Sequence, residues 1–339
     1  QRYLFSNFVG SFASLFSTLF IIMSIVFFLQ IARITSFIEI NFSELVKLYL
    51  FMLPRILIFT VPIAFFVALS ISLFRLSKEN ETIVIFTIGY ATRKIALFFG
   101  ISAALCSLAL LFVSLFMMPI AENLKDNFID YKKISATLNI KSNEFGQKFS
   151  DWLVFIDSQE NNGTSTLYKD LVLYNPGNSQ DHERMIVARS GEFKNENASF
   201  SAMLHDGKIY TMGGEQWHVS EFESLTLRTQ SDRNIRGGGG VIGYWSDMSG
   251  SEKRRKEFSI YTLVSLFPLA SFLFALSLGI VTYRYEKGFV YAGIFGVLFS
   301  YFAMIMLLSK YPSIALPVTF GVTLIASLLY YRIKIAPRY

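Results

Sequence analysis

Residues that could perform catalysis or bind a metal ion are few and widely spaced in this 339-residue chain. The histidines His182, His205 and His218 are scattered, and no two have the close spacing of zinc ligands. Cys106, the single cysteine, lies inside an apolar run, where we expect a small core residue. Sequence motifs of nucleotide-binding loops, serine hydrolases and zinc proteases are absent. We therefore expect no catalytic residue, metal ion or cofactor, and any energy source must belong to a partner protein.

Charged residues next to apolar runs are the stronger candidates. Arg33 ends one uncharged run, and Arg55 lies just inside the next, seven residues before Pro62. Charges at such depth usually face a cavity or a partner, although long side chains also reach back to the headgroups. Four basic residues, at 253–256, precede another run. Arg254 and Arg255 among them would suit phosphate groups, and the alternative is solvated charge at the end of a tether.

The segment 75–94 is too charged to be buried in lipid and too apolar for a free loop. A short helix fits it, with Glu79 and Glu81 in its first turn, Phe86 on its apolar side and its end at Gly89. Such a helix can dock a partner through an apolar stripe and a few charges. The alternative is a helix that rests on the lipid surface.

The elements that must position these residues are membrane helices. The chain is 53% hydrophobic and 17% charged, against about 25% charged in soluble domains. Six stretches lack any charge, and each is close to or longer than the roughly 20 residues that cross a bilayer as a helix. They are residues 3–32, 56–74, 95–121, 258–283, 288–309 and 311–331. We interpret the first as a retained helix, because its apolar part is too long for a signal peptide.

The distribution of basic residues predicts the orientation. With the N-terminus in the cytoplasm, the short inner segments hold ten lysines and arginines, and the short outer segments hold four. The excess of positive charge marks the cytoplasmic side. Both termini are therefore expected in the cytoplasm, and the long segment 122–257 outside it.

The long segment shows two different sequence patterns. Residues 122–145 carry apolar residues at helical spacing, whereas 146–230 hold short β-type runs separated by turn residues. Among these runs we expect separate strands at 200–204 and 208–211, with a turn at Asp206-Gly207 between them, and at 217–219 and 225–227. Residues 231–257, with four consecutive glycines, suggest a flexible tether. The fold class is therefore a polytopic α-helical membrane protein with six transmembrane helices and an inserted all-β, jellyroll-like domain. Residues 1–121 hold helices one to three, with the short helix at about 79–90, and residues 258–339 hold helices four to six.

Short motifs along the whole chain match one known family. They are Arg2-Tyr3-Leu4, the two prolines of the second helix, Glu79-Asn80-Glu81 with Gly89, IVARSG at 186–191, LHDG at 204–207, and Arg254-Arg255. By these residues the chain resembles the lipopolysaccharide-export permeases of the LptF/LptG (YjgP/YjgQ) family. FFLQ at 27–30 followed by Arg33, together with Ser309-Lys310, is more similar to the LptF branch. The glycine-rich tether departs from the family.

The resemblance implies a periplasmic β-jellyroll and an inner-membrane ABC transporter permease that extracts lipopolysaccharide and passes it toward the outer membrane. The implied partners are an LptB-like cytoplasmic ATPase dimer, an LptG-like second permease, and LptC-like and LptA-like bridge proteins, with no nucleic acid. Residues in the coupling helix would be Glu79, Glu81, Phe86 and Gly89. Residues near the lipid phosphates would be Arg33, Arg55, Arg254 and Arg255.

Two other functions fit part of the sequence. A membrane-anchored envelope sensor or assembly factor would explain the β domain, but not the charged and apolar inner helix. An intramembrane enzyme would need paired carboxylates, a histidine cluster or a nucleophile within the spans, and the sequence has none.

Overall fold

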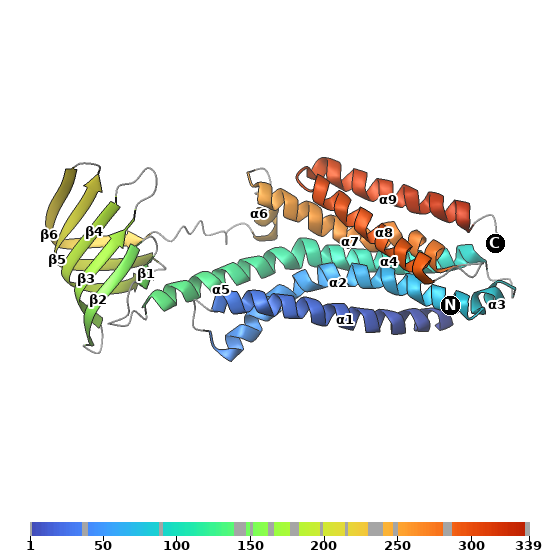
Figure 1. Ribbon diagram of the computed structural model, residues 1–339, viewed down its shortest axis with the longest axis horizontal. Coiled ribbons are helices and arrows are strands. Elements are labelled where there is room, and N and C mark those ends of the chain that lie inside the picture. Colours follow the sequence, from blue (N-terminus) through green and yellow to red (C-terminus); the bar gives the residue numbers. More distant parts are fainter. Residues whose placement is uncertain are drawn as a thin grey trace. The chain divides into compact units, whose positions relative to one another are not determined.

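The computed structural model describes residues 2–35, 40–87, 91–138, 147–149, 152–161, 166–176, 183–196, 199–213, 216–229, 240–246, 250–280 and 287–335 (Figure 1). The chain divides into two compact units. The membrane unit comprises residues 1–35, 41–126 and 236–339, and the second unit comprises residues 36–40 and 127–235.

Six spans in the described part of the chain are long and apolar enough to cross a membrane, which confirms the predicted helical membrane architecture. The third span consists of α4, the π-helix η1 and the start of α5. The helices of these spans are α1 (Arg2–Thr35), α2 (Phe42–Lys78), α4 (Thr92–Phe112), η1 (Val113–Met117), α5 (Met118–Leu138), α7 (Glu252–Gly279), α8 (Lys287–Leu308) and α9 (Pro312–Lys334).

Helices α2 and α7 form the centre of the membrane unit. Most of their apolar windows are buried, 67% in α2 and 78% in α7, whereas 6% of the α1 window is buried. Phe66 of α2 and Phe267 of α7 pack edge to face in the core, and the Tyr301 hydroxyl of α8 donates to the Leu263 carbonyl at 2.6 Å. The outer surface of α1 is therefore left to lipid or to another protein.

The closest approach of α2 and α7 requires a glycine. A Cβ atom at Gly279 would lie 2.5 Å from Cβ of Leu73 and 2.9 Å from the Ser70 carbonyl oxygen. At the same crossing, the Ser77 hydroxyl donates to the Gly279 carbonyl at 3.0 Å. Small residues at this crossing let the two backbones pack directly, as in other membrane helix pairs.

The segment predicted as a flexible tether, 231–257, contains two helical stretches. Helix α6 spans Gly240–Ser246, and α7 already begins at Glu252. The tether prediction is therefore wrong over these residues. Hydrogen bonds and ring contacts of Tyr244 and Trp245 hold α6 against the membrane helices, and such tertiary contacts are not visible in a glycine-rich sequence.

The second unit contains an antiparallel sheet of six strands in the order β1 to β6 (Figure 1). Each described strand pairs with the next one along the chain, so the order is a simple meander. The all-β insert is thus confirmed. The strands are β1 (Gln147–Phe149), β2 (Trp152–Asn161), β3 (Thr166–Asn175), β4 (Glu183–Glu196), β5 (Ser199–Gly213) and β6 (Gln216–Thr229).

A row of charged residues crosses the sheet, one from each of β2 to β6. In each pair of neighbouring strands, these residues lie opposite one another, with paired residues directly before and after them. All five are exposed. On β3, the buried residues on the two sides of this row, Tyr168 and Leu171, are three positions apart instead of two. The alternation of side chains therefore shifts by one residue at the row, and the strand bends there while its inner face stays apolar on both sides. The row is Asp157, Asp170, Arg189, Asp206 and Glu223.

The bend explains why some strands were predicted as two. Asp206-Gly207 was interpreted as a turn between strands, but both residues lie inside β5. Asp206 does adopt a left-handed conformation, with φ of +50°, as does Asp170, with φ of +53°. Aspartate tolerates this region better than most residues. The sequence therefore correctly indicated a turn-like backbone conformation at Asp206, although the strand continues through it. Residues 217–219 and 225–227 are likewise parts of the single strand β6.

Candidate functional site

The predicted short inner helix is present as α3 (Glu81–Thr87). It begins later than the sequence predicted, because Glu79 is the C-terminal cap of α2 rather than part of the first turn of α3. Asn80 between the two helices has φ of +60°, and its backbone N–H donates to the Ser77 carbonyl at 3.2 Å. Such a left-handed cap ends a helix and turns the chain. Gly89 lies outside the described residues.

Side-chain hydrogen bonds tie α3 to α1, and α1 to α2. The Tyr3 hydroxyl donates to the Glu81 carboxylate at 2.7 Å, and the Arg75 guanidinium donates to the Asn7 side-chain oxygen at 2.7 Å. Phe86 packs against the membrane core. The helix is thus fixed on its inner side.

The opposite side of α3 exposes apolar residues. Ile83 is 46% exposed and Val84 is 56% exposed, and Glu79, the α2 cap residue four positions before Ile83, is also exposed. These residues form the α3 face, defined here as Glu79, Ile83 and Val84. An apolar pair beside a carboxylate, on a helix anchored from behind, suits docking of another protein surface.

At the other end of α2, Arg55 lies in a polar cluster instead of facing lipid. Its Nη2 atom is 2.9 Å from Oε1 of Glu122 in α5 and 2.8 Å from the hydroxyl of Tyr261 in α7. Lys125 pairs with the other oxygen of the Glu122 carboxylate. The side chains of Arg55 and Glu122 are 25% and 16% exposed. The charge of Arg55 is therefore balanced within the protein.

Arg254 has similar internal partners. Its guanidinium carbon lies 3.6 Å from the centre of the Tyr244 ring, and its Nη1 atom is 3.4 Å from the Glu257 carboxylate. The Tyr244 hydroxyl donates to the same carboxylate at 3.4 Å. Burial raises the pKa of Tyr244, so this hydroxyl keeps its proton. The interpretation of residues 253–256 as solvated charge on a tether is wrong for Arg254, which lies in the first turn of α7.

Arg33 and Arg255 lie outside this cluster of contacts. Arg33 is exposed in the last turn of α1. Arg255 is half-buried, and its Nε atom, like that of Arg55, is buried with no hydrogen-bond partner in the described part of the chain. The structure thus does not gather the four arginines into one site, and their predicted role near lipid phosphates stays a prediction.

The inner face of the sheet is apolar. Nine residues of β2 to β5 are buried there, with Trp152, Phe222, Leu225 and other large side chains packed against them. Tyr168 is one of the nine, and burial raises its pKa. The buried residues are Val154, Ile156, Tyr168, Leu171, Leu173, Ile186, Ala188, Ala202 and Leu204.

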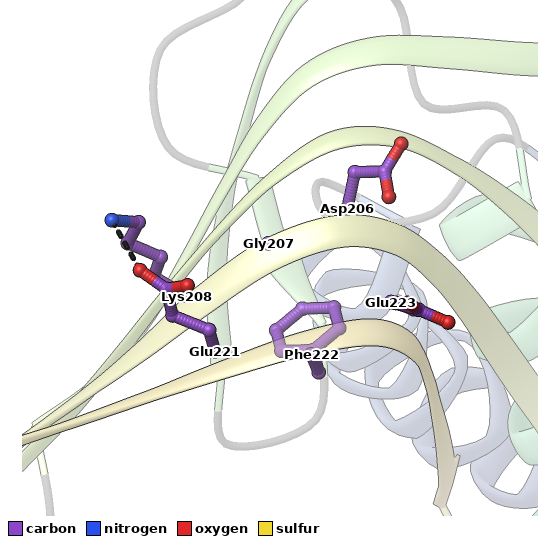
Figure 2. Close-up of a pocket in the computed structure, with 6 residues that line it drawn as sticks. All are labelled: Asp206, Gly207, Lys208, Glu221, Phe222 and Glu223. Atoms are coloured by element: carbon purple, nitrogen blue, oxygen red, sulfur yellow. Dashed lines mark ion pairs between the residues drawn. The ribbon is translucent and has the colours of Figure 1, made fainter.

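A shallow pocket of about 350 Å³ lies on β5 and β6 at the bend of the sheet (Figure 2). Lys208 and Glu221 form an ion pair of 2.6 Å at one end, and the Phe222 ring lies next to Gly207. The hydrogen bond with Lys208 lowers the pKa of Glu221, and Glu221 raises that of Lys208. Both charges are exposed and paired, so this pocket is a weak candidate for a ligand site. His205 and His218 belong to β5 and β6, and His182 lies outside the described residues.

Sequence reasoning missed Glu122, Tyr244, Glu257 and Tyr261 as partners of the arginines. Glu122 and Tyr261 lie 67 and 206 residues away from Arg55 along the chain, so they give no local signal. Glu257 is three residues from Arg254, a helical spacing that could have suggested this pair. A further hint was that a charge inside an apolar span requires an opposite charge nearby.

Residues 2–238 match the family model described as lipopolysaccharide export system permease LptF/LptG. The match covers more than two thirds of the 339 residues and includes α1 to α5 and the whole described sheet. The chain belongs to the LptF/LptG family. A comparison with curated proteins gives no significant match.

Membership in the LptF/LptG family assigns the membrane helices and the sheet to one transport protein. The protein is a multi-pass protein of the inner membrane with a role as a lipopolysaccharide export permease, and it works in an export complex with other subunits. The family is one of transport permeases rather than enzymes. The α3 face and the polar cluster around Arg55 are therefore candidates for docking and for mechanical roles in transport.

Proposed function

We propose that this LptF/LptG family member is the LptF-like permease subunit of an ABC transporter. It extracts lipopolysaccharide from the inner membrane and passes it to a periplasmic bridge. Both termini and α3 lie in the cytoplasm, and the sheet lies in the periplasm. The family match over residues 2–238 is the observation that carries this proposal.

The energy for extraction comes from an LptB-like ATPase dimer that docks on the α3 face. The exposed apolar side chains of Ile83 and Val84 and the exposed carboxylate of Glu79 support this role. Because α3 follows α2 directly and is hydrogen-bonded to α1, which is itself hydrogen-bonded to α2, a displacement of α3 reaches the centre of the membrane unit.

The lipid is recognised by its two chemically distinct parts. Arg33 and Arg255 contact the phosphates, supported by the exposure of the first and the unpartnered Nε atom of the second. The acyl chains follow the apolar inner face of the sheet, which an LptC-like protein and then an LptA-like protein continue. An LptG-like permease supplies the other half of the cavity, and the mainly outward-facing α1 is available to contact it.

The docking role is tested by co-purification of the ATPase with a charge-reversed α3 face. In the Glu79→Lys variant the amount of bound ATPase should fall about tenfold or more, because like charges placed at an interface cost several kcal/mol. Tyr3→Phe is the control, since it removes a hydrogen bond behind α3, to Glu81, and leaves the α3 face unchanged. Equal ATPase recovery from Glu79→Lys and the unaltered protein would reject the docking site.

A further inference from the structure

The segments that lead into and out of the β domain meet on one polar cluster of the membrane unit. Helix α5 begins the path to the sheet, and α6 is the first described element on the way back. Helix α6 contacts the start of α7 directly, and α5 is joined to the same part of α7 through Arg55 of α2 (Figure 1). We call this cluster the clasp, defined as Arg55, Glu122, Tyr244, Arg254, Glu257 and Tyr261.

The outgoing segment is joined to α2 and α7 through one nitrogen atom of Arg55, in addition to the packing of its buried residues Met118 and Ala121. Nη2 of Arg55 lies within hydrogen-bond distance of both the Glu122 carboxylate and the Tyr261 hydroxyl, at 2.9 and 2.8 Å. This atom therefore joins α2, α5 and α7. The pair is largely shielded from solvent, so salt screens it less than a surface ion pair. Loss of one partner would leave a shielded charge unpaired.

The returning segment is held by two side chains of α6. The Tyr244 ring lies beneath the Arg254 guanidinium, and its hydroxyl donates to Glu257, both residues of α7. Trp245 donates its indole N–H to the Leu115 carbonyl of η1 at 3.0 Å and packs on Phe258. Helix α6 thus contacts both α7 and the π-helical turn that precedes α5.

The two halves of the clasp meet on α7. Glu257 and Tyr261 are four residues apart and so lie on the same face, one turn from each other. The negative charges of Glu257 and Glu122 both act on Arg55. The contacts close a ring, from α2 to α5 through Glu122, from α2 to α7 through Tyr261, and from α7 and η1 to α6.

We propose that Arg55 is a positioning residue for export, and that its contacts in the clasp hold the outgoing and returning segments together as one piece on α2 and α7. Because α2 ends at Lys78, directly before Glu79 of the α3 face, a movement of α2 then shifts both segments together. That Arg55 holds the two segments together is a property of this chain alone. Its consequence for export rests on the proposed function.

Hydrogen–deuterium exchange on the purified full-length chain tests the clasp. In Arg55→Met, exchange should rise about tenfold or more at residues 118–126 and also at residues 240–246, because a shielded ion pair that holds the ring is lost. The rise in α6 is decisive, since the hydrogen bonds and ion pair of Arg55 are to α5 and α7. A rise confined to α5, or no rise, overturns the proposal.

Two variants serve as controls. Arg55→Lys should restore slow exchange, since one ammonium group can donate to both partners of Nη2. Lys253→Met removes a charge close to the same cluster, but this side chain is 84% exposed and 3.9 Å from Glu257, so exchange should stay unchanged. If Arg55→Met lost bound lipopolysaccharide with unaltered exchange, Arg55 would be a lipid ligand and not a positioning residue.

The role in export needs a second readout in the assembled complex. Arg55→Met should lower lipopolysaccharide release per ATP hydrolysed by several fold, with the ATPase still bound, and Arg55→Lys should restore it. If Arg55→Met releases as much lipopolysaccharide per ATP hydrolysed as the unaltered protein, the positioning role is overturned. This holds even if exchange rises in both α5 and α6. Failure of the proposed function itself would be seen separately, as loss of ATPase binding to the unaltered protein.

Discussion

Arg254 and Arg255 are neighbours in the sequence but have different surroundings. Arg254 has an aromatic ring and a carboxylate as partners, whereas the Nε atom of Arg255 is buried without one in the described residues. A buried polar atom without a partner is costly, and a ligand oxygen that accepts from it would remove that cost. Arg255 is therefore the better candidate for a lipid phosphate.

The phosphate-binding role of Arg255 predicts a specific loss of lipid. In Arg255→Gln, the lipopolysaccharide retained through purification should fall about tenfold, since charge-assisted hydrogen bonds contribute roughly 1.5–3 kcal/mol. Quantitative mass spectrometry of the bound lipid A measures this. Lys253→Gln, the same charge change at an exposed position nearby, should retain nearly all the lipid. Equal losses in both variants would mean general charge attraction instead of a site.

At the residue scale, the sequence identified unusual charged and apolar residues more reliably than it identified the residues that contact them. Glu81 and Phe86 were placed on a short helix correctly, because the charge and apolar pattern of 75–94 is local. Arg55 was recognised as an unusual charge, but its partners were not. Glu122 was placed at the start of the soluble segment, and only the folded chain brings it to α2.

At the element scale, helices were easier to find than strands. An uncharged run of about 20 residues has one stable conformation in hydrocarbon, because each backbone group must be hydrogen-bonded within the helix. Strands depend on their neighbours, so the bend at Asp206 was mistaken for the end of a strand. The row of exposed charged residues across β2 to β6 becomes visible only once the register of five strands is known.

The crossing of α2 and α7 predicts that Gly279 cannot be replaced. Gly279→Ala should destabilise the membrane unit by about 1–3 kcal/mol, because its Cβ would meet the backbone of Ser70 and Cβ of Leu73. Thermal unfolding of the detergent-purified chain should shift down by about 2 °C or more. Gly296→Ala is the control, since a Cβ there has nothing within 4 Å. Equal midpoints for the two variants would contradict the tight crossing.

At the scale of the whole molecule, the number of spans and the inserted β domain follow from composition. Charge-free runs and β-type runs are separated cleanly along the sequence, since lipid and water select different residues. The clasp could not be found this way. It joins residues 55, 122, 244, 254, 257 and 261 from four helices, and helix α6 lies in a segment whose glycines suggested a tether.

The central claim places the α3 face and the sheet on opposite sides of the inner membrane. Val84 of α3 and Val219 of β6 are similarly exposed, at 56% and 52%, so single cysteines at these positions form a matched pair in a Cys106→Ala background. A membrane-impermeant maleimide is added to cells whose outer membrane has been made permeable. We expect labelling of Val219→Cys, and labelling of Val84→Cys only after the inner membrane is dissolved. Labelling of both variants while the inner membrane is intact, or labelling of Val84→Cys alone, would contradict the account.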